Sequence, residues 1–556
     1  MKPVRYEQKE IERYVKARYW DEKTILTDYW ERNAEKWPDK EALVDSRGIR
    51  LTWKEAVQRL NRIALALVRE LKLNRDDRLM IQLPNIVEQV LVRLACEKAG
   101  VLSIPEMHTF REREIQWIAS QTQAVGIVIQ KKFRNFDYHE MVKQLQYELP
   151  HLKHIIIAGD EVPPGCISLK EIMEHPYERA YELGELETRK LDPIHEVGFL
   201  VTTTGTTGMP KIIEHRIAAR EVWTAKVHIA NWELTPEDTI ATVAPIAGAA
   251  GGTPAYVVAP VAGAKVALDY EGRGDENTLK FMEQEKATVI ALVPTLLARL
   301  VQLPLDNYDL STLRFIKTGG GYLPPALARE AEEKFGCPVL GTFGSQDQGS
   351  VSGVPISAPR EVRYTTVGRV HPGVEMRIVD DDGKEVSRPG EVGQIWFRGP
   401  GNAIGYYRDL GKTLSEAFDR EGWATTGDIV TITEEGYLKI AGRKKDIIIR
   451  GGQNIYPKEV EDLLIAHPKV GEAAVVPMPD PQMGERACAF VTLGQGEVFT
   501  FDEMVDYLKS KKIAMFKIPE RLEVIDTMPL AGGTKIDKKE LTRIVTEKLR
   551  EEGRIG

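Results

Sequence analysis

The sequence predicts an α/β protein built from several domains. Up to about residue 360, short apolar runs alternate with amphipathic stretches, which is typical of βαβ units and largely parallel sheets. Beyond that point, short strands are separated by Gly, Asp and Pro, which indicates an antiparallel barrel or meander. With 556 residues, the chain is long enough for several domains of about 100–200 residues each.

The composition narrows the class of protein. Hydrophobic residues make up 42% and charged residues 28%, as in a soluble globular protein, and the net charge of −8 argues against a nucleic-acid binder. The four cysteines are scattered without a CxxC pair, so neither a zinc site nor a disulfide framework is expected. Residues 1–16 are too charged for a secretory signal, and the apolar residues 243–268 are interrupted by Gly, Ala, Pro and Lys265. We therefore expect a cytoplasmic protein without a transmembrane segment.

The first half of the chain contains clear helix and strand patterns. From Ala56 to Leu71, apolar residues recur at three- and four-residue steps, which predicts an amphipathic helix. Residues 78–84 form an apolar strand pattern that ends at a proline, and a helix is predicted over 86–99 with Gly100 as its stop. Residues 125–129 and 154–158 predict further strands.

The middle of the chain continues the alternation. Strands are predicted over 266–268 and 289–293, and a helix begins at about residue 296. The strand ending at Phe315-Ile316 leads into Gly319-Gly320-Gly321, where a ligand can approach the backbone closely. A helix follows over 324–335, with proline in its first turn.

The last part of the chain predicts a separate small unit. Short strands over 376–379, 393–397 and 437–440 are followed by residues 442–446, which contain no core residue and mark the domain joint. Beyond them we expect helices over 457–466 and 501–511 and strands over 472–476 and 487–492.

The stretch 202–211, with the sequence Thr-Thr-Thr-Gly-Thr-Thr-Gly-Met-Pro-Lys, predicts a polyphosphate-binding loop. Its glycines let backbone N–H groups approach an anion, its hydroxyls add donors, and Lys211 adds a positive charge. The spacing differs from the G-x-x-x-x-G-K-[ST] loop of kinases and GTPases. The structural alternative is a flexible polar connection, but the stretch has more donors than a turn requires.

Four further segments carry polar chemistry. They are Phe343-Gly-Ser-Gln-Asp347, Trp423-Ala-Thr-Thr-Gly-Asp428, Gly451-Gly-Gln-Asn-Ile-Tyr-Pro457 and Pro529-Leu-Ala-Gly-Gly-Thr-Lys-Ile536. With the phosphate loop and Gly442-Arg443, this combination resembles the adenylate-forming superfamily of acyl- and aryl-CoA ligases, carrier-protein adenylation domains and luciferases. The N-terminal half is most similar to aryl-acid-activating members such as dihydroxybenzoate–AMP ligases.

The resemblance implies a domain organisation. Residues 1–444 are expected to form an N-terminal adenylation domain that holds ATP and the acid, made of two α/β subdomains and a small β-barrel. Residues 445–556 are expected to form a small mobile C-terminal α+β domain that rotates about Lys445.

The resemblance also implies the ligand contacts. It assigns Lys535 and Lys211 to catalysis, Asp347 and Thr206 to Mg²⁺, and Gly451 and Gly452 to the coenzyme A tunnel. It assigns ATP or AMP contacts to Thr203, Thr204, Gly205, Thr206, Thr207, Gly319, Gly320, Gly321, Phe343, Gly344, Ser345, Gln346, Asp428, Ile440 and Arg443.

The chain departs from the family pattern at four positions. Ile212 stands where glycine usually follows the lysine, and Gln346 replaces a hydroxyl residue. Asp347 replaces a glutamate, which keeps an oxygen ligand on a shorter arm. The usual histidine after the phosphate loop is displaced, so His215 receives no assignment.

The acyl pocket is predicted from Ala247, Gly248, Ala249 and Gly321. Dihydroxybenzoate-activating relatives carry a His-Asn pair where Gly248-Ala249 stands, and that asparagine recognises a ring hydroxyl. The pocket is therefore expected to be apolar and to accept a benzoate-like, cyclohexane- or cyclohexene-carboxylate-like acid.

The resulting hypothesis is an AMP-forming acyl-CoA ligase that uses ATP, Mg²⁺ and coenzyme A. It forms an acyl-adenylate and then the thioester, in a reaction that can run in reverse. The alternatives are an adenylation enzyme that loads a carrier protein, a medium- or branched-chain fatty acyl-CoA ligase, and a non-catalytic nucleotide-binding regulator. The oligomeric state, monomer or homodimer, is left open.

Overall fold

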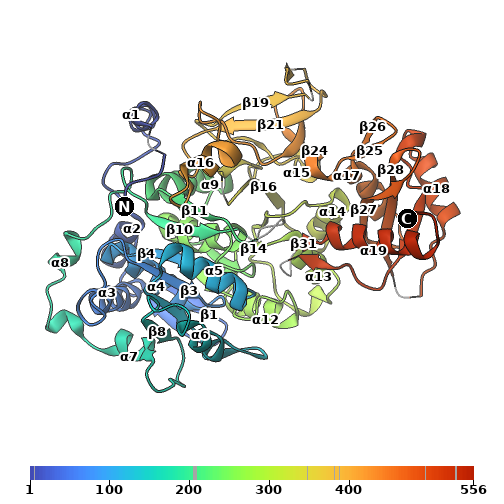
Figure 1. Ribbon diagram of the computed structural model, residues 1–556. Coiled ribbons are helices and arrows are strands. Elements are labelled where there is room, and N and C mark those ends of the chain that lie inside the picture. The colour runs from blue at the N-terminus through green and yellow to red at the C-terminus, as the bar shows by residue number, and fades with distance from the viewer. Residues whose placement is uncertain are drawn as a thin grey trace.

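The computed structural model describes residues 1–5, 7–203, 209–346, 348–380, 382–386, 388–494, 496–531 and 535–555. Figure 1 shows a large body that contains the first 440 or so residues and a smaller C-terminal unit beside it. Among the described helices, none combines the length and the apolar character needed to cross a bilayer.

The first subdomain is built on a five-stranded parallel sheet with the order β4-β3-β5-β8-β9. The strands are β3 (Arg78–Gln82), β4 (Leu102–Pro105), β5 (Gly126–Ile129), β8 (His154–Ile157) and β9 (Ile167–Ser168). Helix α4 (Val87–Ala99) is buried along its whole length, and Gly100 ends it in the left-handed conformation. Strand β3 and helix α4 confirm the predicted strand–helix unit.

The second subdomain contains a nine-stranded sheet with the order β18-β17-β16-β15-β14-β12-β13-β1-β2. Its parallel strands are β1 (Glu41–Asp45), β12 (Thr239–Thr242), β13 (Lys265–Leu268), β14 (Val289–Leu292), β15 (Phe315–Thr318) and β16 (Val339–Ser345). Antiparallel strands extend it at both edges: β2 (Arg50–Thr52), β17 (Gly349–Gly353) and β18 (Arg369–Val370).

Helices cover these sheets in the α/β manner that the sequence predicted. The N-terminal ones are α2 (Leu26–Lys36), α3 (Trp53–Arg69), α5 (Glu112–Thr122), α6 (Tyr138–Gln146) and α7 (Leu169–Glu174). Helix α1 (Gln8–Lys16) lies apart from both sheets, and its Ile11 and Tyr14 pack in a cluster with Trp20 and Trp223. The later ones are α9 (Thr224–Trp232), α10 (Ala249–Gly252), α11 (Ala259–Ala262), α12 (Glu276–Gln284), α13 (Pro294–Leu300), α14 (Pro325–Phe335) and α15 (Arg360–Thr365).

Two smaller sheets complete the large body. Strands β10 (Phe199–Thr202), β11 (Ile212–His215) and β22 (Gly405–Tyr406) form a three-stranded antiparallel sheet. The other is antiparallel with the order β20-β19-β21-β23-β24, from β20 (Glu385–Val386), β19 (Glu375–Val379), β21 (Gly393–Arg398), β23 (Asp428–Ile432) and β24 (Leu438–Arg443). The predicted antiparallel strands are therefore present. Closure into a barrel is not confirmed, because the described pairings leave β20 and β24 as edge strands.

The C-terminal unit packs helices on a five-stranded sheet. Its strands are β25 (Ile448–Arg450), β26 (Gln453–Ile455), β27 (Val470–Asp480), β28 (Gly484–Leu493) and β29 (Arg521–Val524). Helices α17 (Pro457–Ile465) and α18 (Phe501–Ser510) were predicted, whereas α19 (Lys538–Glu551) was not. Leu541, Val545 and Leu549 of α19 are buried in one apolar cluster with β27 and β28, and its remaining positions are rich in charged residues.

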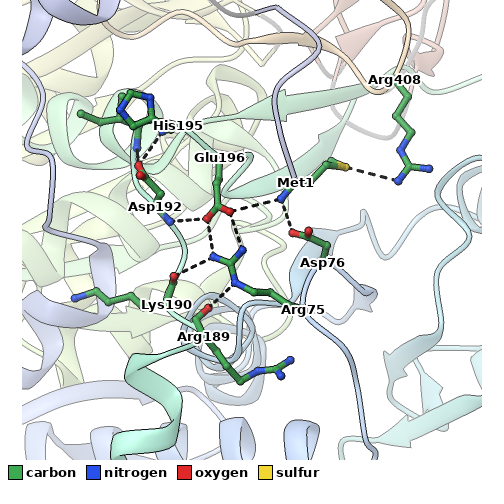
Figure 2. Close-up of polar contacts among 10 residues, drawn as sticks. Met1, Arg75, Asp76, Arg189, Lys190, Asp192, His195, Glu196 and Arg408 are labelled. Carbon is green, nitrogen blue, oxygen red and sulfur yellow. Dashed lines mark hydrogen bonds and ion pairs between the residues drawn. The ribbon is translucent and has the colours of Figure 1, made fainter.

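An ionic cluster attaches the N-terminal segment to the first subdomain (Figure 2). The amino group of Met1 lies 2.5 Å from Asp76 Oδ1. Glu196 accepts hydrogen bonds of 2.7 Å from both terminal nitrogens of Arg75 and from the backbone N–H of Asp192. These contacts hold the segment that precedes β10 against the turn that precedes β3.

Gly349 supports a prediction about the β16–β17 hairpin. Its φ is +90°, and a Cβ atom there would lie 1.9 Å from the carbonyl oxygen of Gly401. Gly383 has a φ of +80° without a described atom within 4 Å of the same position. We expect Gly383→Ala to cost about 1 kcal/mol from backbone strain and Gly349→Ala more than about 3 kcal/mol, because the latter adds a backbone clash. Urea unfolding of both variants measures the difference, and equal losses would contradict it.

Candidate active site

The base of the predicted phosphate loop is a β-hairpin. Strands β10 and β11 pair so that Thr202 faces Ile212. The backbone N–H of Thr203 donates to the carbonyl of Lys211 at 3.1 Å, and the N–H of Lys211 donates to Thr203 Oγ1 at 3.3 Å. The two strands therefore fix both ends of the loop. Thr204, Gly205, Thr206 and Thr207, which were predicted to contact ATP or Mg²⁺, lie outside the described residues.

Lys211 is held by two partners that the sequence did not suggest. Its Nζ lies 2.9 Å from the hydroxyl of Tyr406 and 2.9 Å from a carboxylate oxygen of Glu416. Burial opposes the positive charge of Lys211, but these hydrogen bonds outweigh burial and raise its pKa. The lysine is therefore charged at neutral pH, as an anion-binding role requires.

His215 joins this hairpin to the turn between β16 and β17. Its Nε2 lies 2.9 Å from the carbonyl oxygen of Gln346, so Nε2 carries the proton. Burial lowers the pKa of His215 well below its usual value, which keeps the ring neutral. Arg220, also buried, donates to the side-chain oxygen of Gln346 at 3.3 Å. Neither residue had an assignment from the sequence, because each acts on a segment more than 120 residues away.

The same turn contacts the segment that carries Asp428. Gln348 Nε2 donates to the carbonyl of Thr425 at 3.3 Å, and Asp428 begins β23 three residues later. Arg443 faces Asp428 across β23 and β24 and donates from Nε to Oδ1 at 2.8 Å. The predicted ribose residues therefore form a pair, and they lie next to the turn that begins at Gln346, directly after Ser345 at the end of β16. Asp347, the predicted metal ligand, lies outside the described residues.

The glycine stretch after β15 lies against the predicted acyl wall. A Cβ atom on Gly320, where φ is +78°, would come 3.5 Å from the Cβ of Ala250, and one on Gly319 would come 2.5 Å from Thr342 Oγ1. A Cβ atom on Gly321 would meet Pro294 at 3.5 Å. The close approach at Gly319 requires glycine. The contact at Gly320 brings the stretch beside Ala247, Gly248 and Ala249, which precede and begin α10.

Lys317 is a buried cation beneath this wall that sequence reasoning missed. Its Nζ donates to the carbonyl of Ala250 at 3.1 Å, and no described carboxylate pairs with it. Burial, with a smaller effect from Arg220, lowers its pKa to about 7. Strongly shifted groups of this kind concentrate at functional sites.

Glu106 is a second buried group that sequence reasoning missed. It follows β4 and accepts a hydrogen bond of 2.7 Å from Thr202 Oγ1, at the start of the phosphate hairpin. Burial raises the pKa of this carboxyl well above its usual value, and the Thr202 bond offsets only part of that rise. Burial therefore favours the protonated form of this carboxyl group.

The remaining predicted nucleotide contacts also lie near this region. Phe343 and Gly344 are in β16, and Phe343 packs against the apolar cluster that contains Phe199 and Val351. Ile440 is in β24, where its carbonyl accepts a hydrogen bond from Lys458 of α17.

The residues predicted in the C-terminal unit are exposed. Lys535 begins β31 (Lys535–Ile536), and Gly451 and Gly452 form a solvent-facing turn with φ values of +55° and +83°. Lys445 lies in the 3-10 turn Lys444–Asp446 at the joint. Although Lys445 is exposed overall, partial desolvation of its ammonium group lowers its pKa, with smaller effects from several charges that include Arg443, Asp428 and Lys539. The segment that follows Lys535 thus lies near the Asp428 side of the site.

The described side chains do not form a metal centre of their own. In the described ranges, no group of three or more His, Cys, Asp and Glu residues is arranged to hold a metal ion. Both residues predicted to bind Mg²⁺, Thr206 and Asp347, lie outside those ranges.

Comparison with known families now identifies the chain. The model of the AMP-binding enzyme family matches residues 30–407, and the model of the AMP-binding enzyme C-terminal domain matches residues 459–535. The chain belongs to the AMP-binding enzyme family. The resemblance to the adenylate-forming superfamily is confirmed, and the predicted enzyme class, an AMP-forming carboxylate–CoA ligase, is confirmed at the level of the family.

The curated relatives span nearly the whole enzyme. The medium-chain fatty-acid–CoA ligase of Escherichia coli (strain K12) is 32% identical over 539 residues, covering 95% of this chain and 92% of the relative. The 2-hydroxy-7-methoxy-5-methyl-1-naphthoate–CoA ligase of Streptomyces carzinostaticus is 31% identical over 538 residues, covering 95% of this chain and 94% of the relative. The 2,3-dihydroxybenzoate-AMP ligase of Bacillus subtilis (strain 168) is 32% identical, with 90% and 89% covered.

Solved structures share the fold. The anthranilate CoA ligase AuaEII in complex with anthranoyl-AMP superposes with a TM-score of 0.84 at 23% identity, covering 95% of this chain and 98% of that one. An ATP-bound RpMatB-BxBclM chimera superposes with a TM-score of 0.81 at 26% identity, covering 94% and 99%. The α/β multidomain fold is therefore confirmed.

Glu106 supports a prediction about pH. Between the ordinary glutamate pKa and its raised native value, the native enzyme binds one more proton at Glu106 than the unfolded chain does, so this group makes stability fall as pH rises. Glu106→Gln removes the titration and keeps an acceptor for Thr202. We expect the melting temperature of this variant, relative to wild type, to rise as the pH increases above the ordinary glutamate pKa. Thr202→Val, which removes only the hydrogen bond, serves as the control, and a pH-independent difference for Glu106→Gln would contradict the assignment.

Proposed function

We propose that the enzyme is an AMP-forming acyl-CoA ligase that activates a small, largely apolar, cyclic or aromatic carboxylic acid. The observation that carries the proposal is the set of contacts that joins the phosphate hairpin to the β16–β17 turn and to Asp428. These are the hydrogen bonds from His215 to Gln346 and from Gln348 to Thr425. They bring together polar groups suited to phosphates, to ribose and to an attacking carboxylate.

In the first half-reaction, a carboxylate oxygen attacks the α-phosphorus of ATP and pyrophosphate leaves. Lys211 exchanges its contact with Glu416 for the leaving phosphates and stabilises the charge that accumulates on them. Asp428 accepts hydrogen bonds from the ribose hydroxyls, and Lys535 bridges the attacking carboxylate and the α-phosphate. Asp347 and Thr206 would hold Mg²⁺, which would neutralise phosphate charge.

In the second half-reaction, the thiol of coenzyme A attacks the adenylate carbonyl and AMP leaves. We assign the nucleotide and acid sites to residues 1–444 and the mobile domain to residues 445–556, with Lys445 as the hinge. Rotation about this hinge withdraws Lys535 and brings Gly451 and Gly452 to the site. The exposure of the joint residues Arg443, Lys444 and Lys445 supports this assignment.

The wall formed by Ala247, Gly248 and Ala249 supports the choice of acid. These residues are only partly buried, and their side chains offer no hydrogen-bonding group to a substrate. A benzoate-like or cyclohexane- or cyclohexene-carboxylate-like ring fits such a wall. The naphthoate–CoA ligase relative supports an aromatic acid, whereas the fatty-acid–CoA ligase relative favours a second candidate, a medium- or branched-chain fatty acid. The dihydroxybenzoate-AMP ligase relative keeps carrier-protein loading as the alternative for the acceptor.

A panel of carboxylic acids tests the function. We expect AMP to be released with plain ring acids, and faster when coenzyme A is present. Lys535→Ala is expected to lower adenylate formation by at least about 100-fold while ATP still binds, because a charge that acts in the transition state is lost. Activity on dihydroxybenzoate alone would overturn the choice of acid. AMP release only with a phosphopantetheinyl carrier would overturn the choice of acceptor, and unchanged turnover in Lys535→Ala would overturn the role of that lysine.

The acyl wall supports a specificity prediction. Ala249→Asn introduces an amide where hydroxybenzoate-activating relatives carry asparagine. We expect the ratio of kcat/KM for 2-hydroxybenzoate over benzoate to rise by about tenfold, because the new amide can pair with the ring hydroxyl. Ala249→Leu, which adds similar volume without polarity, should not raise this ratio. An equal change of the ratio in both variants would show that volume alone determines it.

A further inference from the structure

A polar contact between the two domains involves three side chains outside the predicted site. The hydroxyl of Tyr322 donates to Asp462 Oδ2 at 2.7 Å. The Nζ of Lys458 lies 3.7 Å from the centre of the Tyr322 ring and donates to the carbonyl of Ile440. We call Tyr322, Lys458 and Asp462 the latch. Tyr322 and Ile440 precede the joint at 442–446, whereas Lys458 and Asp462 follow it in α17.

The latch connects the acyl wall to the C-terminal lysine motif. Tyr322 directly follows Gly321 of the glycine stretch. On α17, Asp462 is preceded by Glu461. Glu461 Oε1 lies 2.6 Å from Lys538 Nζ and accepts a hydrogen bond of 2.7 Å from the backbone N–H of Val475. Lys538 begins α19, three residues after Lys535. A series of contacts therefore runs from Tyr322 through α17 to the start of α19, three residues after Lys535.

From this geometry we propose that Tyr322, Lys458 and Asp462 are positioning residues that hold the C-terminal domain in the orientation for adenylate formation. The inference rests on the proposed function, because it assigns the present orientation to the first half-reaction. Two observations support that assignment. The Gly451-Gly452 turn, which is predicted to line the coenzyme A tunnel, faces solvent. Lys539, four residues after Lys535, is close enough to Lys445 and the Asp428 side of the site for its charge to act on Lys445.

The chemistry of the latch suits a contact that opens during each cycle. Burial raises the pKa of Asp462 to about 6 and lowers the pKa of Lys458 to about 8, so each charge is less favourable here than in water. Asp462 Oδ1 is buried without a partner among the described residues. Rotation about the joint would return both charges to water, and this gain would offset part of the loss of the hydrogen bonds to Tyr322 and Ile440.

The test separates the two half-reactions. In Tyr322→Phe and Asp462→Ala, we expect the rate of ATP–pyrophosphate exchange to fall by about tenfold, the loss typical of a hydrogen bond to a charged group. The reaction of preformed acyl-adenylate with coenzyme A should be unchanged or faster. Asp462→Asn, which keeps an acceptor for Tyr322, should recover most of the exchange rate. Tyr147→Phe, at a tyrosine that is 85% exposed, is the matched control.

A second measurement does not depend on activity. Arg443, Lys444 and Lys445 are exposed at the joint, so trypsin can cut there. Opening the latch should accelerate this cleavage in Tyr322→Phe and Asp462→Ala but not in Tyr147→Phe. An equal fall of both half-reactions, or unchanged exchange and cleavage, would overturn the latch. A different result would be wild type that activates no acid together with variants that are still cleaved faster. In that case the latch would still be shown to restrain the C-terminal domain, but the proposed function would be wrong.

Discussion

The hydrogen bond from His215 to Gln346 is the contact on which the arrangement of the site depends. It joins the three-stranded sheet that carries the phosphate hairpin to the nine-stranded sheet that carries the β16–β17 turn. Burial keeps His215 neutral, so the contact is a directional N–H donor to a carbonyl and involves no ion pair. Such a bond fixes two segments relative to each other without adding charge beside the predicted phosphate loop.

Around this contact, the enzyme buries ionisable groups that an apolar core does not need. Burial raises the pKa of Glu106 beside Thr202, and Lys317 lies beneath the predicted acyl wall with a lowered pKa. Burying such groups costs free energy unless a partner compensates them. Their location at the predicted phosphate and acyl segments therefore indicates that the site, more than the packing of the core, accounts for them.

The sequence predicted those features that local patterns encode. Strand β3, helix α4 and its stop at Gly100 follow from apolar periodicity and a left-handed glycine. Local patterns could not predict the partners of Lys211, the role of His215 or the buried Lys317. Their contacts join residues that are 195, 131 and 67 positions apart in the chain, respectively. Helix α19 was missed because its charged residues outnumber the apolar positions that pack on the sheet.

The contact of Lys211 with Glu416 has a consequence for the release of products. The ammonium already has a carboxylate partner before any phosphate arrives. Binding therefore exchanges one anion for another, and the free energy gained is only the difference between the two pairs. An internal competitor of this kind weakens the hold on a departing phosphate group as much as on an arriving one. Under the role proposed for Lys211, Glu416 would therefore limit product inhibition at the cost of some ground-state affinity.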